Sequence, residues 1–123
     1  MNDRFKYRVY YKPHNKVYNV VCLNCDRQNE IIIEYKGSTA VVEWKNCEIL
    51  QSTGLKDKNG KLIYEGDICK YKFEEIGEQK AIIYFNKELC SFLAKPLNDF
   101  QYTKINNCEV IGNIYLDSHL LEN

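Results

Sequence analysis

The sequence predicts an all-β protein, and both composition and spacing support that prediction. Residues that favour strands (Val, Ile, Thr, Tyr, Phe and Trp) make up 38 of the 123 positions, whereas alanine occurs only three times. These side chains fit the pleated, half-buried surface of a sheet. Short apolar runs also alternate with clusters of Gly, Asn, Asp and Ser, which is the expected spacing of strands and turns.

The first strand is predicted near the N-terminus because residues 4–9 alternate between basic and apolar side chains. Arg4, Lys6 and Arg8 fall on one face of an extended strand, and the apolar side chains between them fall on the other. A Lys-Pro-His-Asn turn follows, and residues 17–23 form the next strand. We expect the two strands to pair as an antiparallel hairpin.

A second hairpin is predicted from two β-branched runs, residues 30–35 and 40–44. Between them, Gly37 can take the positive φ that a tight turn requires. The apolar pattern then lapses over residues 51–60. We therefore expect a boundary there between an N-terminal β lobe, residues 1–50, and a C-terminal lobe.

The C-terminal lobe, residues 51–116, is predicted to be an SH3-like curled sheet or small barrel. Its strands are short, and turn residues separate them at Gly77, at 86–87 and at 98–99. Four or five strands with this spacing are typical of such architectures. The strands are expected at residues 67–73, 79–85, 89–94 and 108–115.

The composition excludes several classes of protein. With 45% hydrophobic residues and only two prolines, the chain is neither disordered nor collagen-like. No apolar run approaches the roughly 20 residues that cross a bilayer, and the N-terminus lacks the apolar segment of a signal peptide. No membrane partner is expected, and the cytoplasm is the expected compartment.

The six cysteines would suggest disulfides in a secreted chain, but nothing in the sequence indicates secretion. Cys47, Cys69 and Cys108 lie in apolar stretches, where a reduced thiol serves as a small buried hydrophobe. Cys22 and Cys25 form a C-x₂-C pair that could supply half of a zinc site. Because no second pair occurs, two incidental thiols are the favoured interpretation, and no cofactor is expected.

A glycine-punctuated motif, STGLKDKNGKLIYEGDI, occupies residues 52–68. Its Asn59-Gly60 pair can take the positive φ values of a type I′ turn, which predicts a short hairpin tip. In that hairpin Leu62 and Ile63 are expected to pack back onto the sheet. On this interpretation, the motif specifies backbone geometry.

The second half of the motif has two interpretations. In the first, Gly54 and Gly66 serve as backbone pivots, and the tight turn from Tyr64 to Asp67 places the Asp67 carboxylate where it accepts backbone N–H bonds. In the second, Glu65 and Asp67 bind a cation or act as an acid–base pair. The structural interpretation is favoured, because only two carboxylates are present and no histidine lies nearby.

This motif resembles the signature of the YopX family of small bacteriophage and prophage proteins. Residues 6–18, which are rich in basic and aromatic side chains, and residues 110–115 are similar to that family's opening and closing segments. The resemblance implies a mostly β, oligomeric protein encoded by a phage or prophage and located in the bacterial cytoplasm, with no catalytic residues to carry over. Residues 24–45 and 86–107 match no motif of the family, so features specific to this member are expected there.

A nucleic-acid partner is an alternative because the N-terminal strand is basic. Arg4, Lys6, Arg8 and Lys12 form a candidate interaction surface that suits phosphate. In a strand, however, successive side chains point to opposite faces, so the neighbouring aromatic rings lie on the face opposite the basic side chains, toward a core. Residues 1–61 carry a formal charge of +4 and the remainder −4, which equally suits self-association. A solvated strand face ranks first, an oligomer contact second and nucleic acid third.

Enzyme signatures are missing from the sequence. It contains no Gly-rich phosphate loop, no H-E-x-x-H and no nucleophile elbow, and it has only two histidines. We therefore expect a non-enzymatic interaction module that associates with itself, with a host or phage protein as a further partner. The alternatives are a nucleic-acid-binding protein that uses the basic N-terminal strand and a metal-dependent enzyme that uses Glu65 and Asp67.

Overall fold

The structure, a computed structural model, describes residues 6–23, 29–73, 77–97 and 103–122. Ten strands occur in these residues, and the helical segments among them are short 3₁₀ turns. The strands are β1 (Tyr7–Tyr11), β2 (Lys16–Cys22), β3 (Glu30–Tyr35), β4 (Ser38–Glu43), β5 (Cys47–Lys56), β6 (Leu62–Tyr64), β7 (Asp67–Phe73), β8 (Gly77–Asn86), β9 (Ser91–Pro96) and β10 (Glu109–Asn113). The 3₁₀ turns are η2 (Lys12–His14), η3 (Trp44–Asn46) and η4 (Ser118–Leu121).

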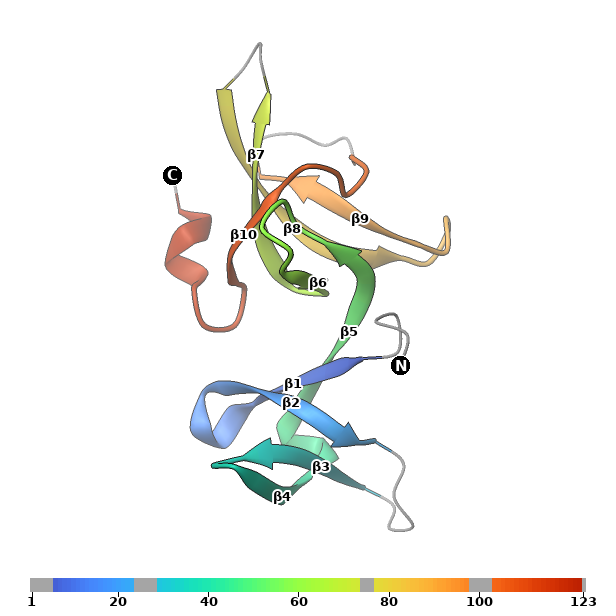
Figure 1. Ribbon diagram of the computed structural model, residues 1–123, viewed down its shortest axis with the longest axis vertical. Coiled ribbons are helices and arrows are strands. Elements are labelled where there is room, and N and C mark those ends of the chain that lie inside the picture. Colours follow the sequence, from blue (N-terminus) through green and yellow to red (C-terminus); the bar gives the residue numbers. More distant parts are fainter. Residues whose placement is uncertain (1–5, 24–28, 74–76, 98–102, 123) are drawn as a thin grey trace.

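The strands form two antiparallel sheets. One has six strands in the order β4-β3-β2-β1-β5-β6, and the other has four in the order β10-β7-β8-β9. In Figure 1, β1, β2, β3 and β4 lie in the lower part of the molecule, β6 to β10 lie in the upper part, and β5 runs from the lower to the upper part. The predicted all-β fold, with an N-terminal antiparallel sheet followed by a C-terminal one, is confirmed. The SH3-like description of the second sheet stays a prediction.

Both N-terminal hairpins have the predicted pairing. In the first, Asn15 closes the turn with a φ of 51°, and Val9 is fully buried on the inner face of β1. In the second, Lys36 and Gly37 both have positive φ, at 48° and 77°. Such a two-residue turn matches the right-handed twist of paired strands, which lets β4 begin at Ser38 immediately after it.

Residues 51–56, in the stretch where the lobe boundary is expected, belong to strand β5, and the division into two lobes stays a prediction. This strand pairs with β1 in its first half and with β6 in its second half. Its polar residues include Ser52 and Thr53, which are buried, and the Thr53 hydroxyl donates to the Ile63 carbonyl at 2.8 Å. Gly54, with a φ of 81°, lies where the pairing register with β6 shifts. Buried polar side chains therefore interrupted the apolar pattern within a strand.

The described residues form two hydrophobic cores. The first core consists of four buried residues of β1, β3 and β4, with half-buried tyrosines and aliphatic side chains around them. The second is built on β6, β7, β8 and β9 and on residue 108, just before β10. The core residues are Val9, Ile31, Ile33 and Val42 in the first and Ile63, Cys69, Tyr71, Ala81, Ile83, Ala94 and Cys108 in the second.

The cysteines in the described residues behave largely as predicted. Cys69 and Cys108 are buried, and Cys47 is half-buried with its thiol donating to the Glu43 carbonyl at 3.3 Å. Cys22 is half-buried at the end of β2, whereas Cys25 lies outside the described residues. No helix in the described part of the chain has the length and apolar character needed to span a bilayer.

Candidate functional site

The candidate site lies on the six-stranded sheet, where the N-terminal strand β1 comes close to β6 of the glycine-punctuated motif. The Arg8 guanidinium lies over the Tyr64 ring, with Cζ 4.2 Å from the ring centroid. Its Nε donates to the Asn19 side-chain oxygen at 3.2 Å. A charged group over an aromatic face is attracted by the negative potential of that face. The structure thus brings together two groups of residues that the sequence analysis considered separately.

A cleft of about 760 Å³ opens beside this contact. Its walls come from β1, β2, β3 and β6, so both halves of the six-stranded sheet contribute to it. The lining combines basic, acidic, aromatic and aliphatic side chains, namely those of Lys6, Tyr7, Arg8, Glu34, Leu62 and Tyr64 among others. Such a mixture can hold a partner that presents both apolar and charged groups. Asn19 and Glu34, on two different strands, carried no local sequence signal for this site.

The predicted basic surface is divided in the structure. Arg4 lies outside the described residues, and Lys6 is exposed at the cleft. Arg8 is half-buried between Tyr64 and Asn19. On η2, the Lys12 Nζ lies 3.5 Å from a carboxylate oxygen of Glu48 in an exposed ion pair.

Asp67 is buried, with only 5% of its surface exposed, at the start of β7. Its Oδ2 accepts the Tyr64 backbone N–H at 2.8 Å, as the structural interpretation of the motif predicts. Burial raises the pKa of Asp67 from its ordinary 3.8 to about 6, against the lowering effect of the Tyr64 N–H and the Arg8 charge. The N–H bond holds the turn, while burial penalises the charged carboxylate.

Glu65 also bonds to backbone. Its Oε1 accepts the Gln51 N–H at 3.0 Å, and its own N–H donates to the Gln51 carbonyl at 2.9 Å. Glu65 therefore ties the β6–β7 turn to β5. Among the residues that the structure describes, no three metal-ligating side chains gather at any point.

Gly66, between these two acidic residues, is surrounded by other elements. Its φ is 82°, and its N–H donates to the Ile83 carbonyl of β8 at 2.8 Å. Its carbonyl accepts the Ile114 N–H at 2.9 Å. A Cβ at this position would lie 3.3 Å from the Tyr115 ring, which itself stacks on Tyr10 of β1 at 4.8 Å between centroids. The turn therefore anchors segments from both sheets.

Asp57 is a structural residue that the sequence analysis did not single out. Its Oδ1 accepts the N–H groups of Asn59 and Lys61, both at 2.9 Å, and its Oδ2 accepts the Val110 N–H of β10 at 2.9 Å. Burial would raise the pKa of Asp57, but these three N–H bonds outweigh it and hold the pKa below its usual value. An Asp that opens a turn is a recognisable signal for such bonding.

The turn that Asp57 opens corrects the predicted type I′ geometry. Gly60 has a φ of 83°, whereas Asn59 is not among the residues with positive φ. The Gly60 N–H donates to the Asp57 carbonyl at 3.0 Å, and Ile63 is fully buried, as predicted. The left-handed conformation is therefore at Gly60 and not at Asn59, whose N–H donates to the Asp57 carboxylate at 2.9 Å.

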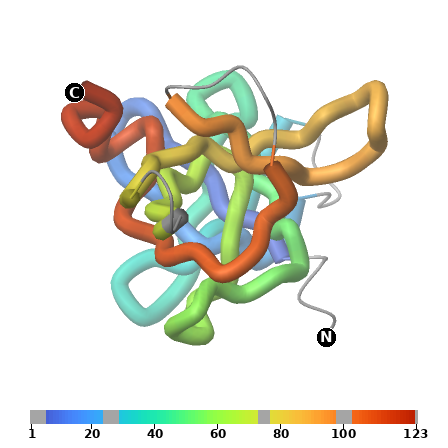
Figure 2. The backbone as a smooth tube through the Cα atoms, turned by 90° about the horizontal axis from the view of Figure 1, so that it is seen from above, coloured from blue at the N-terminus to red at the C-terminus, as the bar shows by residue number. Residues whose placement is uncertain are grey.

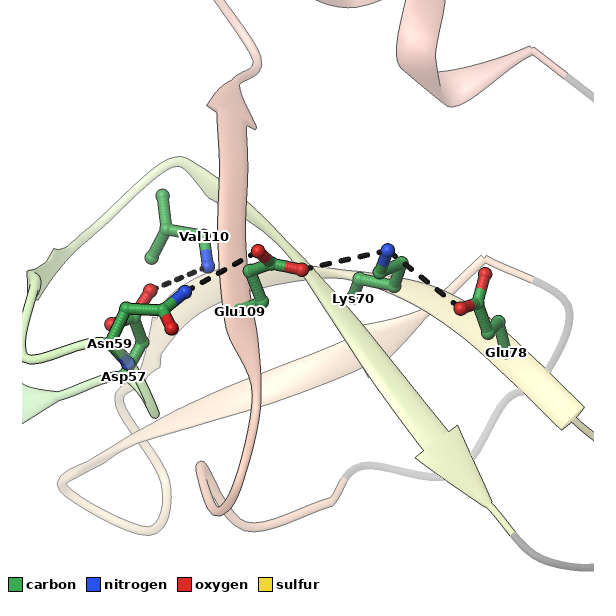
Figure 3. Close-up of polar contacts among 6 residues, drawn as sticks. All are labelled: Asp57, Asn59, Lys70, Glu78, Glu109 and Val110. Atoms are coloured by element: carbon green, nitrogen blue, oxygen red, sulfur yellow. Dashed lines mark hydrogen bonds and ion pairs between the residues drawn. The ribbon is translucent and has the colours of Figure 1, made fainter.

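A chain of polar contacts extends from this turn across the second sheet (Figure 3). The Asn59 side-chain amide donates to Glu109 at 3.3 Å, and Lys70 lies 3.5 Å from Glu109 and 3.7 Å from Glu78. Seen from above in Figure 2, the orange-red segment that leads into β10 runs near the green region around the turn. Glu78, in the negatively charged part of the chain, is thus paired with a lysine of its own chain.

Comparison with known proteins assigns the fold and the motif to a family. A family model described as YopX protein matches residues 6–122, nearly the whole chain. The chain belongs to the YopX family. A similar solved structure is the crystal structure of protein EF1440 from Enterococcus faecalis, with 26% sequence identity, a TM-score of 0.65, and coverage of 95% of this chain and 97% of that chain. A search of curated proteins gave no match. The resemblance found in the sequence is therefore confirmed, and this YopX chain shares its fold with EF1440.

Proposed function

We propose that this YopX chain is a phage- or prophage-encoded, non-enzymatic interaction module of the bacterial cytoplasm that associates with copies of itself. The observation that carries the proposal is the use of the signature carboxylates. Asp57, Glu65 and Asp67 all accept backbone N–H bonds that hold turns and join strands. Carboxylates that accept backbone N–H bonds stabilise the fold. On this proposal, the motif holds the strands in place so that the surface of the protein can bind a partner.

The charge distribution supports self-association. The formal charge is +4 over residues 1–61 and −4 over the remainder. The chain as a whole is therefore neutral, but its positive and negative charges are unevenly distributed along the sequence. Opposite charges on two regions of one surface favour contacts between copies, because the positive region of one copy attracts the negative region of the next.

Light scattering on the purified chain, coupled to size-exclusion chromatography, tests self-association. The proposal expects a mass that is a multiple of 14.6 kDa at physiological salt. A monomer over the whole accessible concentration range contradicts it.

Elemental analysis tests the proposal that the protein is not an enzyme. A stoichiometric divalent metal that is present in the parent protein and lost in Glu65→Gln would restore the metal-enzyme alternative.

A nucleic-acid-binding function is the second candidate, because Lys6 and Arg8 line the cleft beside two tyrosine rings. It expects salt-sensitive retention of a single-stranded oligonucleotide that weakens in a Lys6→Ala, Lys12→Ala double variant. The matched control is Lys95→Ala with Lys104→Ala, which removes two exposed lysines from the acidic half. Equal retention by the two double variants, or none at low salt, excludes the basic strand as a nucleic-acid surface.

A further inference from the structure

The two sheets end in four edge strands, β4, β6, β9 and β10, and in three of these the chain itself supplies partners for outward backbone groups. The Asp57 carboxylate and the Lys58 N–H bond to Val110 and Cys108 along the edge of β10. On β9, Ala94 and Thr103 exchange two backbone hydrogen bonds, at 3.0 and 2.9 Å. On β6, the Tyr64 N–H donates to the buried Asp67 carboxylate.

β4 differs from the other three edges. Its N-terminal residue, Ser38, pairs with β3 directly after the two-residue turn, and the Trp44 N–H bonds to Asn29 just beyond its other end. Because hydrogen-bonded and non-bonded pairs alternate in an antiparallel ladder, the backbones of Thr39, Val41 and Glu43 face away from β3. Of their six N–H and C=O groups, only the Glu43 carbonyl has a partner among the described residues, the Cys47 thiol.

β4 also lacks most of the features that usually prevent edge strands from pairing, and its one charged residue, Glu43, lies at its C-terminal end. It has six residues, it contains neither proline nor lysine, and its ladder with β3 runs without a register shift. Val41, in its centre, is an aliphatic residue with 57% of its surface exposed. Figure 1 shows β4 at the lower end of the molecule, with no other described strand beyond it. Natural proteins protect long, regular edges of this kind with charge, bulges or a covering segment.

The geometry points to β4 as the strand through which two copies of this chain associate, an inference that rests on the self-association in the proposed function. Antiparallel pairing about a two-fold axis at Val41 is self-complementary. Val41 then faces Val41 of the other copy, and Thr39 faces Glu43 in both directions, so all six outward backbone groups gain partners. On the inner face, Ala40 comes opposite Val42, which joins the two N-terminal cores into one continuous layer.

The β4 contact between two copies is small, and its small size determines how its formation should be measured. A single six-residue strand pair buries less surface than the roughly 1,000 Å² that a stable specific interface needs. The β4 contact is therefore a reversible one, and its population depends on protein concentration. Opposite charges elsewhere on the two copies add to it without changing which strands pair.

Residue-resolved amide hydrogen exchange, followed by NMR at low and high protein concentration, tests the inference. The Ala40 and Val42 amides bond to β3 within the chain and serve as internal controls, because they are protected at both concentrations. The Thr39, Val41 and Glu43 amides are expected to exchange at least about tenfold more slowly at high concentration, where β4 is paired. Unchanged exchange of these three amides in a sample that scatters as an oligomer overturns the β4 contact but leaves the proposed function intact.

Two variants give an independent measurement by sedimentation over a dilution series. Val41→Lys places two like charges opposite each other across the two-fold axis, and Val41→Pro removes an outward N–H without removing a hydrogen bond within the chain. Both are expected to weaken dimerisation at least tenfold while the circular dichroism spectrum is kept. The matched control is Leu89→Lys, which replaces a side chain 62% exposed in the turn between β8 and β9. Equal dimerisation by Val41→Lys and Leu89→Lys overturns the inference, and a monomeric parent protein overturns both the inference and the proposed self-association.

Discussion

Asp67 combines a structural hydrogen bond with an energetic penalty. Its carboxylate holds the Tyr64 N–H, yet burial raises its pKa to about 6, above the ordinary 3.8 of the unfolded chain. The folded state therefore retains the proton more readily than the unfolded state. The stability that this proton contributes is fully present below pH 3.8 and is lost as the pH rises through 6.

Asp67→Asn tests this linkage, because the amide oxygen can still accept the Tyr64 N–H but does not titrate. The free energy of unfolding of Asp67→Asn, relative to the parent protein, is expected to rise by about 2–3 kcal/mol between pH 4 and pH 8. Urea unfolding at several pH values measures the difference, and the other carboxylates cancel in the comparison. A difference independent of pH would show that Asp67 titrates at its ordinary value.

Gly60 and Gly66 share nearly the same backbone conformation but differ in their surroundings. Their φ values are 83° and 82°, and a Cβ at Gly60 meets nothing within 4 Å, whereas one at Gly66 lies 3.3 Å from the Tyr115 ring. Gly60→Ala is expected to cost about 1 kcal/mol from backbone strain alone. Gly66→Ala adds the displacement of Tyr115 and is expected to cost about 2–3 kcal/mol. Chemical denaturation of the two variants compares these costs, and equal values would mean that Tyr115 moves aside freely.

At the level of elements, the Asp57 turn joins the end of β5 to β10, which lies about fifty residues later in the chain. Its two carboxylate oxygens accept three N–H groups, including that of Val110 (Figure 3). The bond to Val110 occupies an outward donor on β10, so the turn both anchors this strand and closes the sheet edge.

Asp57→Ala leaves these three N–H groups without their acceptor and is expected to lower the free energy of unfolding by about 2–4 kcal/mol. The loss should appear first as faster amide exchange at Val110. The matched control is Asn59→Ala, which removes only an exposed side-chain contact to Glu109 and should cost less than about 0.5 kcal/mol. If the two variants are equally stable, the carboxylate does not hold β10.

For the whole molecule, contacts other than strand pairing join the two sheets. The Gly66 N–H, just after β6, donates to the Ile83 carbonyl of β8 at 2.8 Å, and Tyr10 of β1 stacks on Tyr115, just beyond β10, with ring centroids 4.8 Å apart. We expect a single cooperative unfolding transition, with equal calorimetric and van't Hoff enthalpies. Two resolved transitions in differential scanning calorimetry would instead show that residues 1–50 and 51–116 unfold as independent lobes.

The sequence by itself determined the strand content, the two N-terminal hairpins and the family. These features follow from local rules, because alternation of side chains, β-branched runs and turn residues such as Gly37 act within a few positions of one another. The hydrogen-bonding role of Asp67 could be predicted for the same reason, because its partner, the Tyr64 N–H, lies only three residues away.

Tertiary structure alone decided the rest. Ser52 and Thr53 resemble loop residues, but they are buried in β5. There the Thr53 hydroxyl donates to the Ile63 carbonyl of β6, and the Ser52 hydroxyl accepts the Gly54 N–H, so hydrogen bonds compensate for the burial of both polar groups. Asp57 reaches Val110, and Arg8 lies over Tyr64, across separations that no local pattern records. Closure of the β10 edge depends on the distant bond from Val110 to Asp57, because a backbone donor finds such a partner only once the chain has folded.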